Sequence, residues 1–297
     1  MDKKISIVVH SGGFHADDIF AVATLMLALG EDSEFSVTRT RDENIINRGD
    51  CVVDVGGVYN ETANRFDHHQ IGGAGVRENG IPYASFGLVW KKFGEELCGN
   101  VEIANKIDQK LIQPIDAIDN GVNIIEPIFE GIYPYNVYDF FDVLIPTWKE
   151  EGADIDKIFL EAVSCAKIIL KREIKKRKDG EEARHIVIEE YNKSKDKRLI
   201  VFDRFYPSGE TLMEFTEPLF KIYPRQEGTW ALEGIKTDHH SFNRRKFLPE
   251  IWAGKKDEEL ENITGISGAV FCHVGRFIAV AKTKEAILKL AAVALNN

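Results

Sequence analysis

Short apolar runs and longer apolar stretches alternate along the first 120 residues. The short runs have the length of buried strands, whereas the longer stretches keep the spacing of helices. This pattern predicts strands at 5–9, 34–40, 51–55 and 64–66, and helices at 17–29, 85–97 and 101–119. Gly30 is placed to end the first helix. The order of strand, helix, two strands and further helices predicts an α/β domain with a mostly parallel sheet over residues 1–150.

The pattern changes near residue 150 into one long helical repeat. Apolar residues keep helical spacing from Ile155 to Ile174 and lead into the basic run KREIKKRK at 171–178, where the helix is predicted to end. Basic side chains are favourable at a helix C-terminus, which favours a solvated face over an RNA contact for this run. We interpret residues 151–195 as a helical connector.

The second half of the chain is richer in predicted strands. They are expected at 199–203, 219–223, 230–235, 269–273 and 276–281. Val274-Gly275 is typical of a tight hairpin between the last two, and Thr283 is placed to cap a final helix that reaches about Leu295. The expected architecture is therefore a mostly parallel α/β domain, a long connector helix and a smaller α+β domain over residues 196–297.

Composition narrows the class of protein. The 297 residues are 44% hydrophobic, which supports a normal packed core. The first residues do not read as a signal peptide, and no apolar run is long enough to span a bilayer. The four cysteines are scattered without a CxxC pair, so we expect a reduced, cytoplasmic setting. A net charge of -10 argues against a protein that coats nucleic acid non-specifically.

Acidic and imidazole side chains recur at the predicted strand ends of the first domain. They are His10, His15, Asp17, Asp54, His68, His69 and Asp119. The carboxyl ends of parallel strands form the usual site of an open α/β sheet, so these groups are expected to meet there. Imidazoles and carboxylates together are typical ligands of a divalent metal. Taken singly, Asp17 also reads as a helix cap and Asp54 as a turn residue.

A second Asp-His-His triplet, at 238–240, lies in the polar stretch KTDHHSFNRRK. No predicted strand delivers it, and no aspartate lies at the end of a strand before it. We interpret this triplet as a surface or substrate-loop segment and not as part of the metal site.

Several spaced motifs resemble a known family. They are HSGGFHADD at 10–18, TRTRD at 38–42, VVDVGGVYN at 52–60, RFDHHQ at 65–70, IDAIDNG at 115–121, SFNRRKFLPEIWAG at 241–254 and GISGAVFCHVGRFIAVAKTKEA at 265–286. Together they resemble the DHH phosphoesterase superfamily and, within it, the melanocyte-proliferating-gene (Myg) family. The first domain would then be a DHH-type phosphoesterase domain and the last a substrate-binding domain.

The resemblance implies two divalent ions, usually Mn²⁺, that activate a water for attack on phosphorus. One ion would be held by His10, His15 and Asp54, and the other by Asp17, Asp54, His68 and Asp119. Asp54 would bridge the ions, His69 would face the substrate phosphate or orient a ligand, and Asp54, His68 and His69 would form the catalytic group. His15 departs from the superfamily's common aspartate and lies one residue further on. Asp116 competes with Asp119, which the Asn-Gly turn after it favours.

Substrate cations are expected from both halves of the chain. In the second half the candidates are Arg245, His273 and Lys282, with Arg225 and Arg244 weaker. Arginine suits bidentate phosphate contacts, although each of these side chains also reads as an ordinary surface charge. In the first half, Arg39 and Arg41 read either as phosphate contacts or as partners of Asp50 and Asp42.

The function implied by the resemblance is a metal-dependent phosphodiester hydrolase, specifically a 3′-to-5′ exoribonuclease. Its substrate would be single-stranded RNA or a short oligonucleotide, and the protein a monomer or homodimer away from membranes. A second interpretation is a hydrolase of pyrophosphate or of short or cyclic dinucleotides, since the same metal centre supports it. A third is a non-catalytic metal-binding regulatory protein, against which the intact ligand set argues.

Overall fold

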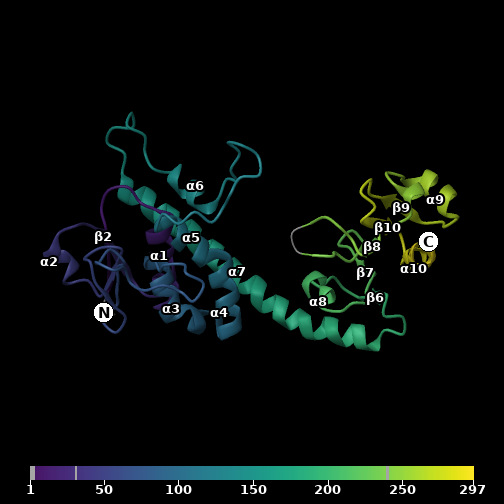
Figure 1. Ribbon diagram of the computed structural model, residues 1–297, viewed down its shortest axis with the longest axis horizontal. Helices are drawn as coiled ribbons and strands as arrows, with labels where there is room; N and C mark the ends of the chain where they lie inside the picture. The colour runs from purple at the N-terminus through teal and green to yellow at the C-terminus, as the bar shows by residue number, and fades with distance from the viewer. Residues whose placement is uncertain (1–3, 31, 239–240) are drawn as a thin grey trace. The chain divides into compact units, whose positions relative to one another are not determined.

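The computed structural model describes residues 4–30, 32–238 and 241–297, and the described chain falls into two compact units (Figure 1). The first unit runs up to Lys178 and the second begins at Asp179. The predicted domain boundaries at residues 150 and 195 stay a prediction, since this division lies between them.

The first unit is built on a five-stranded sheet of order β2-β1-β3-β5-β4. Its strands are β1 (Ile5–Val9), β2 (Phe35–Arg39), β3 (Cys51–Val53), β4 (Tyr59–Asn60) and β5 (Arg65–Phe66). The pairs β1/β2, β1/β3 and β3/β5 are parallel, and only β4/β5 is antiparallel among the paired strands described. The predicted mostly parallel sheet is therefore confirmed, and the four strands β2, β1, β3 and β5 run parallel side by side.

The helices of the first unit cover this sheet and pack on one another. They are α1 (Ala16–Ala28), α2 (Glu43–Ile46), α3 (Ser85–Cys98), α4 (Val101–Ile107), the π-helical η1 (Asp108–Ile112), α5 (Gln113–Asp119) and α6 (Val137–Asp142). Helix α1 is apolar all round because it contacts α3, α5, α6 and β3. Phe20 on α1 stacks on Phe86 on α3, with ring centroids 5.1 Å apart.

The predicted helix at 101–119 is one run of helical turns that widens in the middle. Its π-helical segment lies directly before Pro114, which occupies the first turn of α5. Proline has no N–H to donate to the preceding turn, so the hydrogen-bond ladder changes its spacing there. Helix α6 lies in a stretch for which the sequence pattern gave no prediction.

Helix α7 (Ile155–Lys193) corrects the prediction of where the long helix ends. It runs for 39 residues, so the basic run at 171–178 lies inside the helix and not at its C-terminus (Figure 1). Gly180 does not break it. Val187 and Tyr191, four residues apart, are buried against Ile200 of the second unit, and this packing stabilises the last turns.

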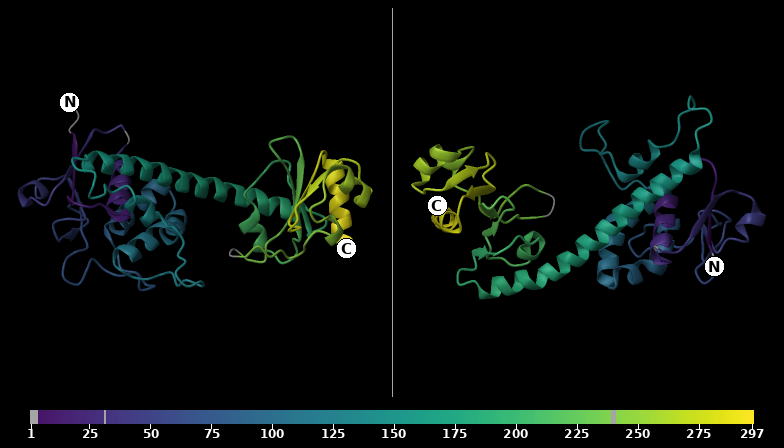
Figure 2. Two further views of the ribbon diagram at one scale, coloured as in Figure 1. Left: turned by 90° about the horizontal axis from the view of Figure 1, so that it is seen from above. Right: turned by 180° about the vertical axis from the view of Figure 1, so that it is seen from behind.

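The second unit is the expected α+β fold. It contains β6 (Leu199–Val201), α8 (Gly209–Met213), β7 (Phe220–Pro224), β8 (Trp230–Gly234), η2 (Glu250–Trp252), α9 (Asp257–Thr264), β9 (Ala269–Cys272), β10 (Ile278–Ala281) and α10 (Lys284–Asn296). The sheet order is β6-β7-β8-β10-β9. The pair β6/β7 is parallel, and the other described pairs are antiparallel. Helix α10 lies against this sheet (Figure 2).

Two local predictions in the second unit are confirmed. Strands β9 and β10 form an antiparallel hairpin, whose turn is closed by the N–H of Arg276 donating to the carbonyl of His273 at 2.8 Å. The hydroxyl of Thr283 accepts from the N–H of Ala286 at 3.1 Å and caps α10. Within the described residues, no helix combines the length and apolarity needed to cross a membrane.

Alanine substitutions at two helical glycines, Gly87 and Gly180, test how tightly the start of α3 is packed. A Cβ at Gly87 would lie 1.9 Å from Oδ2 of the buried Asp116, whereas nothing lies within 4 Å of one at Gly180. We expect Gly87→Ala to destabilise the protein by about 2 kcal/mol or more and to lower Tm by roughly 4–8 °C.

The matched control is Gly180→Ala, which should raise stability by about 0.5–1 kcal/mol because alanine is the better helix former. Calorimetric melting of both variants measures the two shifts. Equal Tm values for Gly87→Ala and the wild type would contradict the close packing at the start of α3.

Candidate metal centre

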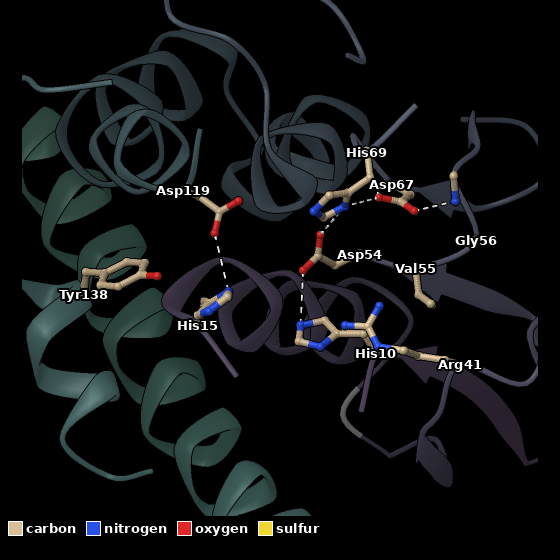
Figure 3. Close-up of a pocket in the computed structure, with 11 residues that line it drawn as sticks. His10, His15, Arg41, Asp54, Val55, Gly56, Asp67, His69, Asp119 and Tyr138 are labelled. Carbon is tan, nitrogen blue, oxygen red and sulfur yellow. Dashed lines mark hydrogen bonds and ion pairs between the residues drawn. The ribbon is translucent and has the colours of Figure 1, made fainter. Parts of the chain in front are cut away.

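Three parallel neighbouring strands deliver the polar residues of the site. His10 follows β1, Asp54 follows β3, and His68 and His69 lie just beyond β5. Asp54 has a φ of 54°, in the left-handed region that aspartate adopts more readily than most residues. The edge of the sheet therefore brings these side chains together, and Figure 3 shows His10, Asp54 and His69 of this group.

Asp54 lies at the centre of the cluster. Its Oδ2 is 3.3 Å from Nε2 of His10, and its Oδ1 is 3.3 Å from Nε2 of His68. Nε2 of His10 is also 2.9 Å from Oδ2 of Asp18, and Nε2 of His68 is 3.2 Å from Oδ2 of Asp119. The two oxygens of one buried carboxylate thus face two different sets of ligand atoms.

These side chains form three overlapping groups with the geometry of metal ligands. The groups are His10-Asp18-Asp54, Asp54-His68-His69 and Asp17-His68-Asp119, and the ligand atoms within each group lie within 4.8 Å of one another. Oδ2 of Asp18 and Nε2 of His68 are buried and make no hydrogen bond of good geometry within the described chain. Buried polar atoms need a partner. A divalent ion fits this need, and the mixed oxygen and imidazole donors suit one.

The buried carboxylates of the cluster change the pKa values of the two imidazoles beside them. Burial lowers the pKa of His10, but the carboxylates of Asp18 and Asp54 outweigh it and raise the pKa to about 10. Burial likewise lowers the pKa of His68, and Asp119, Asp54 and Asp17 raise it to about 11. The buried carboxylates thus favour positive charge at this place, for which a metal ion would compete with protons at the imidazole nitrogens.

Asp17 binds the backbone at the start of α3. Its Oδ1 accepts from the N–H of Phe86 at 2.7 Å and its Oδ2 from the N–H of Ser85 at 3.2 Å, so it caps α3. Burial and then the neighbouring Asp119 raise its pKa well above the usual range. As a cap it serves α3 and not its own helix, because the N-cap of α1 is His15.

Asp116 and Asp119, the two candidates for the last ligand position, have different neighbours in the structure. Oδ2 of Asp116 lies 2.7 Å from a guanidinium nitrogen of Arg77, and its Oδ1 accepts from the N–H of Gly87 at 3.0 Å. Burial raises the pKa of Asp116 to about 7, against the opposing effect of Arg77. Asp119 instead belongs to the group with His68 and lines the pocket. The geometry therefore places Asp119 in the cluster and Asp116 at the start of α3.

Asp18 is the cluster residue that the predicted ligand set left out. It is fully buried in the first turn of α1, and its Oδ1 accepts from the N–H of His15 at 2.9 Å. The sequence could have indicated Asp18 as a ligand, since it directly follows Asp17 in the motif HSGGFHADD.

His15, by contrast, is 43% exposed with its Nδ1 3.8 Å from Asp119, and lies outside the three groups. Its function as a ligand stays a prediction.

A pocket of about 410 Å³ opens over the cluster. Its lining residues are His10, His15, Arg41, Asp54, Val55, Gly56, Gly57, Asp67, His69, Asp119 and Tyr138. The guanidinium of Arg41 reaches beside His10 (Figure 3). His69 is 62% exposed, with its Nδ1 2.7 Å from Asp67. Tyr138, from α6, did not figure in the sequence analysis.

Arg39 is not part of this pocket lining. Its side chain is buried, and it donates to Oδ1 of Asp156 at 2.9 Å and to the carbonyl of Gly12 at 2.6 Å. Its guanidinium also lies over the ring of Phe159, 4.9 Å from the centroid. The carboxylate partner of Arg39 is thus Asp156 rather than Asp42 or Asp50, and the arginine holds the loop between His10 and His15.

The predicted substrate cations of the second half all lie in the second unit. Arg245 donates to the backbone carbonyls of Met213, Phe215 and Pro218, which ties its guanidinium to the protein. Nδ1 of His273 accepts from the N–H of Gly275 at 2.9 Å.

The remaining candidates occupy different surroundings. Lys282 is exposed, Arg244 lies over the ring of Phe277, and Arg225 is 3.4 Å from Glu227. Substrate binding by these side chains stays a prediction. His239 and His240 of the second triplet lie outside the described residues.

Similarity to known proteins extends over nearly the whole chain. Residues 6–295 match the family model MYG1_exonuc, described as an uncharacterised protein family (UPF0160). The chain is 32% identical over 324 residues to "MYG1 protein" of Dictyostelium discoideum, covering 99% of the chain and 98% of that protein. It is 30% identical over 338 residues to "MYG1 exonuclease" of Bos taurus, covering 97% and 84%. The resemblance to the Myg family is confirmed, and the chain belongs to the MYG1 family.

Proposed function

We propose that this chain is a divalent-metal-dependent phosphodiester hydrolase that removes nucleotides from the 3′ end of single-stranded RNA. The observation that carries the proposal is the position of Asp54, whose two oxygens face separate groups of ligand atoms. A carboxylate in this position suits a pair of ions, for which Mn²⁺ matches the mixed donors. The printed name of the bovine relative, an exonuclease, supports a nuclease.

The ligand set we propose extends the predicted one by Asp18. His10, Asp18 and Asp54 would hold one ion, with His15 at its exposed side. Asp17, Asp54, His68 and Asp119 would hold the other. When bound, two such ions lower the pKa of a water and neutralise charge that develops on the phosphoryl oxygens. The hydroxyl of Ser85 donates to Oδ1 of Asp54 at 3.1 Å and fixes the orientation of the shared carboxylate.

His69 is the proposed proton carrier. Asp67 accepts from its backbone N–H at 3.0 Å and lies 2.7 Å from its Nδ1, while the other oxygen of Asp67 accepts from the N–H of Gly57. An ionised carboxylate only accepts, so Nδ1 carries the proton and Nε2 is left to exchange one with the substrate. A solvent-exposed imidazole held in this way is suited to protonate the leaving oxygen.

Arg41 is the proposed phosphate contact of the first unit. It is exposed, lines the pocket and reaches beside His10 (Figure 3). The pocket is otherwise rich in carboxylates, and the chain has a net charge of -10. A phosphodiester therefore needs the bound ions to enter, so we expect binding of substrate to depend on metal.

The first prediction concerns the reaction. The purified protein with Mn²⁺ should shorten a 5′-labelled single-stranded RNA from its 3′ end, one nucleotide at a time, and a chelator should stop it. Denaturing gels at single-nucleotide resolution measure this. An absence of cleavage, with hydrolysis of pyrophosphate or a cyclic dinucleotide instead, would replace the nucleic-acid substrate by a small phosphate.

The second prediction concerns the shared carboxylate. Asp54→Ala should reduce hydrolysis more than about 100-fold, because it removes a ligand from both groups at once. Circular dichroism checks that the variant stays folded. Activity within a few fold of the wild type, in a folded variant, would show that the site is assigned wrongly.

The third prediction distinguishes a carboxylate that binds metal from one that only stabilises the fold. Asp18→Asn should weaken Mn²⁺ binding by about 10–100-fold, the size of effect known for groups at a metal site. Asp116→Asn, a matched change three residues before the end of α5, should leave Mn²⁺ affinity within a few fold and lower Tm instead. Titration calorimetry and thermal melting of both variants measure this. The reverse pattern would place Asp116, and not Asp18, at the metal.

A further inference from the structure

Helix α6 brings an additional aromatic side chain to the pocket. The helix begins with a capping box in which Asn136 accepts from the N–H of Asp139, and Asp139 accepts from the N–H of Asn136. Phe141 is fully buried and packs edge-on against Phe20 of α1, with ring centroids 5.6 Å apart. The cap and this anchor fix the rotation of a helix that is only six residues long.

Tyr138 lies three residues before Phe141, on the same face of the helix. Its ring stacks on His15 with centroids 5.8 Å apart and an interplanar angle of 19°. The hydroxyl points toward the gap between His15 and Asp119 (Figure 3). It has no hydrogen-bond partner among residues 4–30, 32–238 and 241–297, although the side chain lines the pocket. A fixed ring thus presents a free hydroxyl to the place where substrate would bind.

The hydroxyl remains a donor over the whole working range of pH. A tyrosine hydroxyl ordinarily keeps its proton up to about pH 10. The pocket otherwise presents mainly carboxylate oxygens and imidazoles, and Arg41 is the arginine among its lining residues. A neutral O–H donor adds a contact for an anionic oxygen without adding charge close to the ions.

We propose that Tyr138 is a substrate-binding residue, whose hydroxyl donates a hydrogen bond to a phosphoryl oxygen of the terminal nucleotide. The inference rests on the proposed function for the identity of that nucleotide. It assigns to α6 the recognition of the group that is cleaved. The stacking on His15 holds the ring, and the hydroxyl alone makes the contact.

Removal of the hydroxyl tests the contact. Tyr138→Phe keeps the ring on His15, and Tyr135→Phe is the matched control on the same segment. Tyr135 is 68% exposed, and its hydroxyl donates to the carbonyl of Asp139 at 3.0 Å, outside the pocket lining. Adenosine 5′-monophosphate, the kind of product expected from the reaction, is titrated into the manganese-loaded proteins by calorimetry.

We expect Tyr138→Phe to weaken binding of adenosine 5′-monophosphate about tenfold or more, the size of effect typical of a hydrogen bond to a charged acceptor. The Mn²⁺ affinity of both variants should equal that of the wild type, and Tyr135→Phe should bind the nucleotide normally. Unchanged nucleotide binding by Tyr138→Phe overturns the proposal. So does a loss of Mn²⁺ affinity in that variant, which would make Tyr138 a support for the metal ligands.

The RNA assay keeps this result apart from the proposed function. If the wild type does not shorten RNA but binds the nucleotide in a Tyr138-dependent manner, the exoribonuclease proposal fails and the contact stands. If it shortens RNA and Tyr138→Phe binds the nucleotide like the wild type, the contact alone fails. A manganese-loaded wild type that does not bind the nucleotide also overturns the contact.

Discussion

The first unit depends on how it neutralises a set of buried carboxylates. Asp17, Asp18, Asp54 and Asp116 are all nearly or fully inaccessible to solvent. An unpaired charge in such surroundings costs several kcal/mol, so each needs a partner. Asp116 has Arg77, and Asp17 has the N–H groups at the start of α3. Asp18 and Asp54 lie beside imidazoles, which only partly neutralise the two carboxylates. These acidic and imidazole groups could together hold a metal ion.

The N-terminus of α3 connects the structural and the functional parts of this set. Asp17 and Asp116, on two other helices, accept from the first N–H groups of α3, and Ser85 at its first position donates to Asp54. The positive end of the helix dipole lies at these carboxylates and stabilises them. The lack of a side chain at Gly87 allows Asp116 to approach. One helix end therefore holds carboxylates in and beside the candidate site in place.

Much of the fold follows from local pattern. Strand β1, helix α1 and the run from α4 to α5 were predicted within a residue or two, since continuous apolar runs mark buried elements. The length of α7 was not predicted, because its last turns are polar on most sides and are stabilised by contacts of Val187 and Tyr191 far along the chain. Segment 120–150 also gave no prediction, because α6 is short and is fixed by Phe141 packing on α1.

The candidate site was predictable to the extent that strand ends dictate it. His10, Asp54 and His68 lie at the ends of neighbouring parallel strands, a relation that can be read from the sequence. Asp18 required the orientation of the first turn of α1, in which His15 caps the helix and Asp18 turns back toward His10. Sequence spacing cannot tell two adjacent aspartates apart, because both lie in the same turn. Only packing decides which oxygen meets which imidazole.

Arg39 joins the candidate site to the start of helix α7. Its guanidinium joins the carbonyl of Gly12, in the loop between His10 and His15, to Asp156 in the first turn of α7. Arginine suits this place because it stays charged when buried and donates in two directions at once. The same α7 continues unbroken until Tyr191 is buried in the second unit. The two hydrogen bonds of Arg39 thus join the backbone of the loop between His10 and His15 to the first turn of the helix that leads into the other half of the chain.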